Sequence, residues 1–251
     1  MHILIKPADL GPIPQVYCLE FVLIVIPEKV AYIKVPKAAS TAIARLFWER
    51  HGVKQNTTLN SDVATNVRYF VSLKQVATQI PILNGNWFYN RSGAFGWHAG
   101  YRDLVHVFGD QLVDFHWVAS VRHPVSRLFS VFSYQVASER LNASLSAKDF
   151  EHFCEMVFRD CGELSPQQRV HTLPQVDWLP TPEEVPTLSI VRQERLSSDL
   201  KRLGSVVPSF RNSTLSSVNK SFDGDANQYI SSTLKSRIES HYSEDMERLD
   251  Y

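Results

Sequence analysis

Two short segments combine small, hydroxyl-bearing and basic residues in a spacing that suits phosphate binding. The first consists of Pro36, Lys37, Ala38, Ala39, Ser40 and Thr41. Lys37 supplies a mobile positive charge, while Ala38 and Ala39 are small enough for the backbone to approach an anion closely. Ser40 and Thr41 can either cap a helix or donate hydroxyl hydrogen bonds. Glycines are absent, so the segment is not the GxxxxGK[ST] loop of nucleoside triphosphatases.

The second segment places an arginine at the end of an apolar run and a serine eight residues later. Arg122 follows the run, and Pro124 suits the first turn of a helix. An arginine in this position can bind phosphate through two hydrogen bonds, and Ser130 can share the same anion. Taken alone, each segment is better explained by a surface basic residue beside a helix, so the two are considered together.

The elements predicted around these segments place both at the ends of strands. The β-rich runs 20–26 and 30–35 predict two paired or neighbouring strands. Apolar residues at helical spacing follow in 42–51, so the second strand feeds a helix. Residues 115–121 predict a buried strand and residues 125–137 a helix. A strand, a turn and a helix therefore occur twice.

Later segments extend the same alternation of strands and helices. Residues 188–191 predict a short strand and 196–203 a helix, while apolar residues recurring from Ile230 to Leu249 predict one amphipathic helix. Residues 67–76 and 101–108 also look helical. The alternation favours an α/β fold with a central, mostly parallel sheet flanked by helices, which binds ligands at the carboxyl ends of its strands.

Composition limits the remaining possibilities. The chain has 251 residues, 44% of them hydrophobic and 21% charged, which predicts one globular domain over residues 1–251 and excludes a disordered chain. Its 26 basic residues balance 26 acidic ones, so no global field favours nucleic acid or a membrane surface. The longest apolar run, 21–27, is too short to span a bilayer. No Cys/His cluster suggests a metal, and we expect reduced thiols at Cys18, Cys154 and Cys161.

Together, the two segments resemble the cofactor signature of the sulfotransferases, which use 3′-phosphoadenosine 5′-phosphosulfate (PAPS) and release adenosine 3′,5′-bisphosphate (PAP). PKAAST is similar to their 5′-phosphosulfate loop, and VRHPVSRLFSVF to their 3′-phosphate motif. The resemblance implies a P-loop-like sulfotransferase fold. It also implies that PAPS is bound by the first segment and by Arg122 and Ser130.

Further segments resemble the Golgi-type carbohydrate sulfotransferases, a sulfotransferase family 2-like group, over about residues 20–251. HTLPQVDWL at 171–179 is similar to that group's His-x-x-Pro-Gln segment, and LSIVRQERLSSDLKRL at 188–203 to its strand and following helix. VNKS at 218–221 and the terminal RIESHYSEDMERLDY match its closing pattern. The resemblance therefore adds Lys220 and Ser221 to the cofactor site.

The resemblance also implies a catalytic base. FGWHAGYRDL at 95–104 is similar to the histidine-bearing segment of the uronyl 2-O-sulfotransferases, in which His98 matches the base. A histidine titrates in the range that such a base needs. His171, His123 and His116 remain competitors, and Glu194 is an acidic alternative. Lys37 is the second catalytic residue, because its charge can stabilise the departing phosphate oxygen.

The acceptor follows only from the resemblance, which implies a carbohydrate hydroxyl. A soluble small alcohol or amine is an alternative, since the loops 84–97 and 141–149 that would shape the acceptor site carry no recognisable code. A catalytically silent nucleotide- or glycan-binding module and an ATP-dependent phosphotransferase are alternatives of other classes. We expect a cytoplasmic location, with the secretory or Golgi lumen as the alternative because five Asn-x-Ser/Thr sequons are present. The oligomeric state cannot be predicted.

Overall fold

The structure, a computed structural model, centres on a five-stranded mixed sheet. It describes residues 16–18, 22–25, 29–43, 46, 100–102, 105, 112, 114–138, 141–159, 163–212 and 226–251. The strands are β1 (Val16–Cys18), β2 (Val22–Val25), β3 (Val30–Ile33), β4 (His116–Val121) and β5 (Leu188–Arg192). They lie side by side in chain order, with β4 between β3 and β5.

The three strands β3, β4 and β5 are parallel, whereas β1 and β2 are antiparallel to their neighbours. Ile33 is paired with Ala119, and Val121 with Arg192, so the carboxyl ends of the three parallel strands meet at one edge of the sheet. This confirms the predicted α/β fold. The antiparallel pairing of β2 with β3 also confirms that the first two predicted strands are neighbours.

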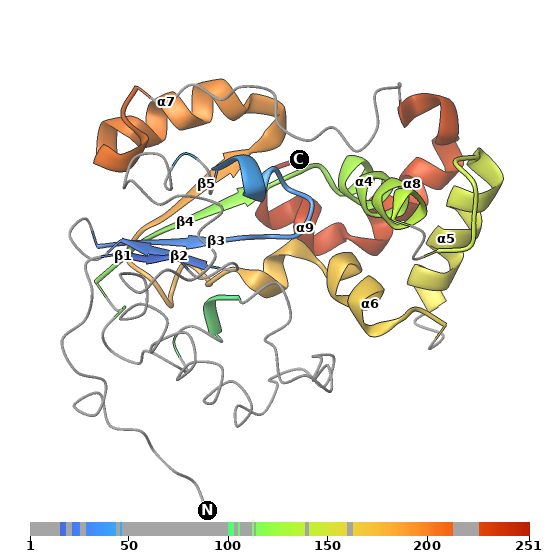
Figure 1. Cartoon of the computed structure of the whole chain (residues 1–251), viewed down its shortest axis with the longest axis horizontal. Coiled ribbons are helices and arrows are strands. Elements are labelled where there is room, and N and C mark those ends of the chain that lie inside the picture. Colours follow the sequence, from blue (N-terminus) through green and yellow to red (C-terminus); the bar gives the residue numbers. More distant parts are fainter. Residues whose placement is uncertain are drawn as a thin grey trace, which may run out of the picture.

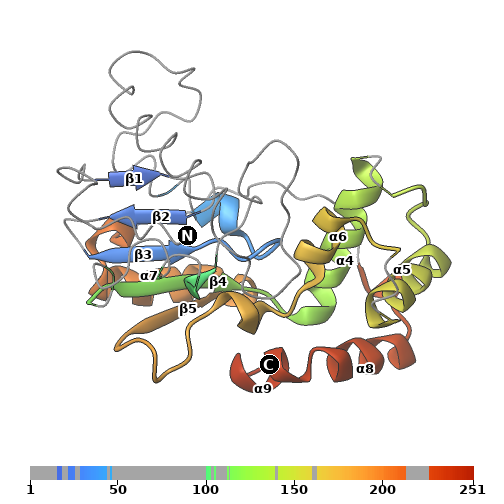
Figure 2. The same cartoon turned by 90° about the horizontal axis from the view of Figure 1, so that it is seen from below.

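The helices lie on the faces and at one end of the sheet. They are α4 (Pro124–Ala137), α5 (Ala147–Arg159), α6 (Pro166–Thr172), α7 (Leu196–Val206), α8 (Ser232–His241) and α9 (Ser243–Arg248). Short 3-10 turns are η4 (Gln175–Trp178), η5 (Gln193–Arg195), η6 (Pro208–Phe210) and η7 (Ala226–Tyr229). α7 runs along the sheet, and α4, α5, α6 and α8 gather beyond the carboxyl ends of the parallel strands (Figures 1 and 2).

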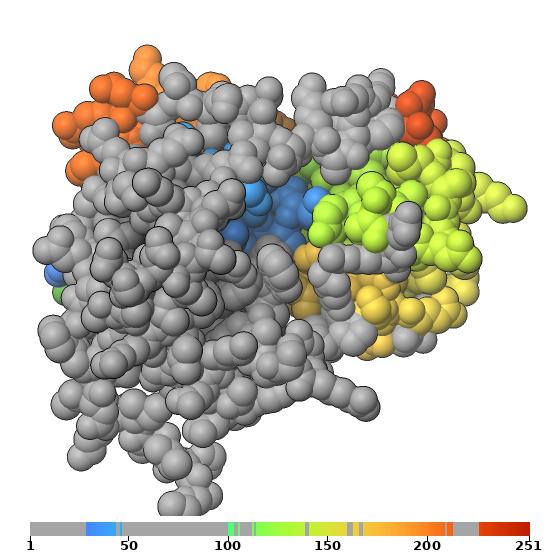
Figure 3. All heavy atoms as spheres, in the orientation of Figure 1, coloured from blue at the N-terminus to red at the C-terminus, as the bar shows by residue number. Residues whose placement is uncertain are grey.

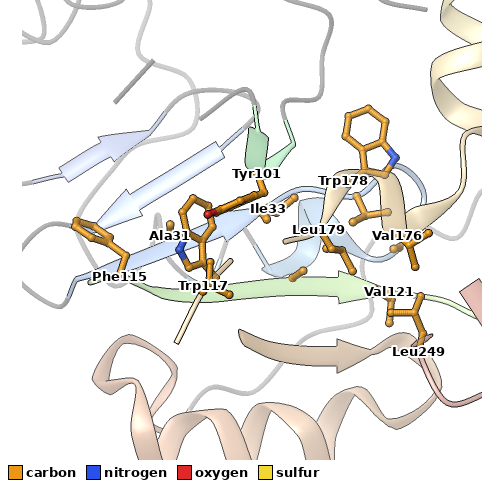
Figure 4. Packing of buried hydrophobic residues seen from close by; sticks show 14 of the residues in the cluster. Ala31, Ile33, Tyr101, Phe115, Trp117, Val121, Val176, Trp178, Leu179 and Leu249 are labelled. Carbon is orange, nitrogen blue, oxygen red and sulfur yellow. The ribbon is translucent and has the colours of Figure 1, made fainter. Parts of the chain in front are cut away.

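Alternating side chains of β3 and β4 build a core on each face of the sheet. Tyr32 and Val118 pack with residues of α7 on one face, including Leu200. Trp117 is fully buried on the other face, where its ring meets that of Tyr101 edge-on at 4.9 Å (Figure 4). Because both faces of the sheet are covered, the sequences of β3 and β4 are nearly continuous runs of apolar residues.

A third apolar cluster joins the helices at the end of the sheet. Phe132 of α4 packs against Phe150 and Phe153 of α5, with ring centroids 5.3 and 5.6 Å apart. Ile238 and Tyr242 from the C-terminal segment complete the cluster. α4 therefore has a fixed position relative to β4, from which it continues.

The structure corrects one predicted element and adds others. The single helix expected over residues 230–249 is two helices, because Tyr242 ends α8 and its backbone leaves helical geometry. The buried Tyr242 hydroxyl donates to the Thr172 carbonyl at 2.6 Å, which fixes the break. α5, α6 and β1 occur where no element was predicted. The helix expected over 67–76 lies outside the described residues. Within the described residues, no helix is long and apolar enough to cross a membrane.

Candidate functional site

The loop after β3 has an unusual backbone that suits anion binding. Lys37 and Ala39 have φ values of 62° and 59°, in the left-handed region that non-glycine residues rarely adopt. Left-handed residues within such a turn aim successive N–H groups into one concave space. Among the described residues, none accepts a hydrogen bond from the N–H groups of 37–41. These donors and their strained backbone are features of a phosphate-binding loop.

The structure places Ser40 and Thr41 inside the helix and not at its cap. The Ala39 carbonyl accepts hydrogen bonds from the N–H groups of Ala42 (3.0 Å) and Ile43 (3.2 Å). Ala39 therefore precedes the helix as its cap, and Ser40 and Thr41 lie in the first turn. The hydroxyls do not cap the helix, and the first-turn N–H groups remain at its positive end.

Lys37 is a partly buried cation whose ammonium lies over an aromatic ring. Its Nζ lies 4.0 Å from the centroid of the Tyr134 ring. Burial and the positive charge of Arg122 lower the pKa of Lys37 from 10.5 to about 8. No carboxylate among the described residues forms an ion pair with it. The side chain therefore bears a charge that the described part of the protein leaves uncompensated.

Arg122 is a second cation at the neighbouring strand end. It follows Val121, the last residue of β4, and burial lowers its pKa while the negative charge of Glu194 opposes that shift. Its backbone N–H donates to Gln175 Oε1 at 2.9 Å, and Gln175 Nε2 donates to its carbonyl at 2.8 Å. Two partly desolvated cations thus meet at the carboxyl ends of β3 and β4, where α/β sheets bind ligands.

Helix α4 connects the two predicted segments. Pro124 is its first residue, as predicted, and Ser130 is only 7% exposed. Ser130 and Tyr134 are four residues apart and share a helix face, and the Tyr134 ring contacts Lys37. Ser130 therefore lies on the face that looks toward the Lys37 loop. In the space-filling view, the blue residues from the N-terminal half are recessed beside the green of α4 (Figure 3).

The described histidines occupy different places. The His116 ring bonds Ser189 Oγ at 2.8 Å where β4 begins, at the edge opposite Arg122. His123 caps α4, since its Nδ1 accepts from the Val125 N–H at 3.3 Å, and its Nε2 lies 3.7 Å from a Glu239 carboxylate oxygen. These positions exclude His116 from the strand-end site and leave His123 beside it.

His171 braces the site from within. Its Nδ1 bonds the Gln135 amide nitrogen at 3.3 Å, and its ring meets Tyr134 edge-on. Its carbonyl accepts a hydrogen bond from the buried Arg127. His171 is thus positioned behind the ring that holds Lys37.

Three predicted site residues lie outside the described part of the chain, and two residues that contact the site were not predicted. His98, Lys220 and Ser221 lie outside the described residues. Tyr134, which contacts Lys37, and Gln175, which bonds the Arg122 backbone, were not among the predicted site residues. Tyr134 is one helical turn after Ser130, and Gln175 lies in the segment resembling His-x-x-Pro-Gln. In the described part of the chain, no group of three His, Cys, Asp or Glu residues could hold a metal ion.

Comparison with known proteins gives one match. The family model described as "Sulfotransferase family" matches residues 23–251, which include β2–β5 and both strand-end segments. No curated protein and no solved structure matches the chain. The matched range agrees with the resemblance noted over residues 20–251.

Proposed function

Because the chain belongs to the sulfotransferase family, we propose that it transfers a sulfuryl group from PAPS to an acceptor hydroxyl and releases PAP. The observation that carries this proposal is the pairing of Lys37 and Arg122. Lys37 has no carboxylate partner among the described residues, and Arg122 is close enough to lower its pKa, so an anion bound between the two cations is favoured. PAPS carries phosphate groups at both ends of its ribose, so a single molecule would compensate both charges.

Each strand end binds a different phosphate group of the nucleotide. Lys37, Ser40 and the N–H groups of the surrounding loop bind the 5′-phosphosulfate, while Arg122 and Ser130 bind the 3′-phosphate. The other residues that we assign to the cofactor site are Pro36, Ala38, Ala39, Thr41, Lys220 and Ser221. This assignment is supported by the loop's unused N–H groups and by α4, which links Arg122 to the ring that contacts Lys37.

The proposed reaction is an in-line displacement at sulfur. The acceptor oxygen forms a bond to sulfur as the bond between sulfur and the 5′-phosphate oxygen breaks. His98 accepts the proton of the attacking hydroxyl, and Lys37 stabilises the negative charge that develops on the departing phosphate oxygen. We propose a carbohydrate as the acceptor, on the resemblance of the 171–179 and 188–203 segments.

Ligand-dependent thermal stability tests the cofactor assignment. We expect PAP at about 100 times its dissociation constant to stabilise the protein by about 2.7 kcal/mol, a rise in melting temperature of about 5–10 °C. AMP and ATP lack the 3′-phosphate and should stabilise it less. Arg122→Ala should abolish the advantage of PAP over AMP, because it removes the proposed partner of the 3′-phosphate.

Arg159→Ala provides the matched control. Arg159 is exposed on α5 and pairs with Glu155, so its loss changes the same net charge without touching the strand ends. It should keep the preference for PAP. Equal stabilisation of the wild-type protein by PAP, AMP and ATP would contradict the proposed function.

The ionisation of Lys37 predicts a pH dependence of PAP binding. Its pKa is about 8 in the free protein, and a bound phosphate favours the charged form. The phosphates of PAP lose their second proton near pH 6 and keep a constant charge above pH 7. We therefore expect the affinity, measured by calorimetry, to fall about tenfold from pH 7 to pH 9. Lys37→Met should remove this dependence, and a flat wild-type profile would show that Lys37 does not contact phosphate.

A further inference from the structure

The connector between β4 and α4 is held by two buried side chains that take no part in the proposed sulfuryl transfer. Pairing of β4 with β5 ends at Val121, and α4 begins at Pro124. Arg122 therefore lies where neither a strand ladder nor a helix sets its backbone. Its N–H and carbonyl are instead bonded to the side chain of Gln175, which is fully buried.

These two hydrogen bonds determine the direction of the Arg122 side chain. The N–H of Arg122 belongs to the peptide plane before its Cα, and its carbonyl belongs to the plane after it. Gln175 accepts from the first at 2.9 Å and donates to the second at 2.8 Å through one rigid amide group. Fixing both planes fixes the direction of the Cα–Cβ bond, from which the guanidinium extends.

A buried carboxylate in turn fixes the Gln175 amide. Asp245 Oδ2 accepts from the backbone N–H and Nε2 of Gln175 at 3.0 and 3.2 Å, and Oδ1 accepts from the Val176 N–H at 2.9 Å. Asp245 is fully buried, and no Lys or Arg of the described residues forms an ion pair with it. A buried carboxylate without a cation is costly, and here its hydrogen bonds all serve the segment that holds Arg122.

We infer that Gln175 and Asp245 are positioning residues that aim Arg122 at the 3′-phosphate of the nucleotide. This inference rests on the proposed function, because it takes the role of Arg122 from it. Asp245 orients the Gln175 amide, and Gln175 orients the backbone of Arg122. The guanidinium therefore already points toward the phosphate before the nucleotide binds. Preorganisation of this kind strengthens binding by reducing the ordering that the ligand must impose.

The experiment compares dissociation constants for PAP and AMP, which differ only in the 3′-phosphate. Asp245→Asn keeps the shape of the side chain but turns one acceptor into a donor that faces an N–H group. Gln175→Met keeps the length of the side chain and removes both bonds to Arg122. In each variant we expect the preference for PAP over AMP to fall about tenfold or more, while the affinity for AMP changes less than about twofold.

Gln168→Ala is the matched structural control. Gln168 is also buried, and its Oε1 accepts from the Ser165 N–H at 2.7 Å at the start of α6. Its loss should lower the melting temperature and leave the PAP preference intact. Melting curves of all variants identify those that fold, so either Asp245→Asn or Gln175→Met is sufficient for the test.

The outcomes separate the inference from the proposed function. If the wild-type protein prefers PAP and a folded variant at position 175 or 245 keeps that preference, or loses PAP and AMP affinity equally, the positioning role is overturned. If the wild-type protein shows no preference for PAP, the proposed role of Arg122 is itself wrong, and the inference falls with it. A loss of the PAP preference with little change in AMP affinity, in the folded variants at positions 175 and 245, supports both the positioning role and the proposed function.

Discussion

Replacing Lys37 by methionine is expected to lower the rate of sulfuryl transfer about 10²–10³-fold, the loss typical of removing one group that stabilises developing negative charge. The ammonium lies over the Tyr134 ring, at the end of β3, where the 5′-phosphosulfate is proposed to bind. Single-turnover measurements at saturating PAPS would report this loss directly, because they separate the chemical step from donor binding.

The same substitution should not destabilise the protein without ligand. The folded-state pKa of Lys37, about 8, lies below its unfolded value of 10.5, so the unfolded chain binds more protons between these pH values. At pH 7 the partly buried charge therefore lowers the free energy of unfolding, and removing it should leave the melting temperature equal or higher. Lys201→Met, on the exposed side of α7, is the matched control and should retain full activity. A variant that keeps normal turnover at position 37 would refute the proposed role.

Replacing His98 by alanine is expected to reduce turnover about 10²–10⁴-fold while PAP affinity stays unchanged, because a general base acts on the acceptor proton and not on the nucleotide. Steady-state rates with a labelled sulfate donor, together with PAP calorimetry, would show the separation. Added imidazole should restore part of the activity, since it can replace the missing base.

Other histidines supply the controls for this experiment. His116 bonds Ser189 at the amino end of β4, away from the proposed site, so His116→Ala should turn over nearly normally. His123 lies beside Arg122, and its pKa is lowered mainly by burial. Normal turnover by His98→Ala, with a large loss in His123→Ala, would transfer the base role to His123.

The sequence predicts the two strand ends that form the site because each is marked by residues that are neighbours in the chain. The apolar runs of β3 and β4 predict buried strands, and Pro124 marks the start of α4 correctly. The same dependence on neighbouring residues explains the elements that were predicted wrongly or missed. β1 has only three residues, too few to show an alternating pattern, and the apolar spacing from Ile230 to Leu249 passes unbroken through the end of α8 at Tyr242.

The contacts that assemble the site could not be predicted in this way. Gln175 bonds Arg122 across 53 residues and Asp245 bonds Gln175 across 70, and neither pair leaves a period in the sequence. Similarly, helical spacing predicts α4 but not that its Tyr134 ring lies under Lys37. Such partners depend on how the elements pack, which hydrophobic spacing specifies only as a fold class.

The hydrogen bonds from Asp245 through Gln175 to Arg122 also set an order in time. During synthesis, Arg122 leaves the ribosome first, Gln175 follows 53 residues later, and Asp245 a further 70 residues later. At about 5–20 residues per second, translation separates the appearance of the arginine from that of its last support by several seconds or more. A nascent chain that has just completed β4 and α4 therefore still lacks both side chains that hold the Arg122 backbone. If Arg122 binds the nucleotide as proposed, donor binding would become effective only when the C-terminal helices have packed, and it would then depend on the completion of folding.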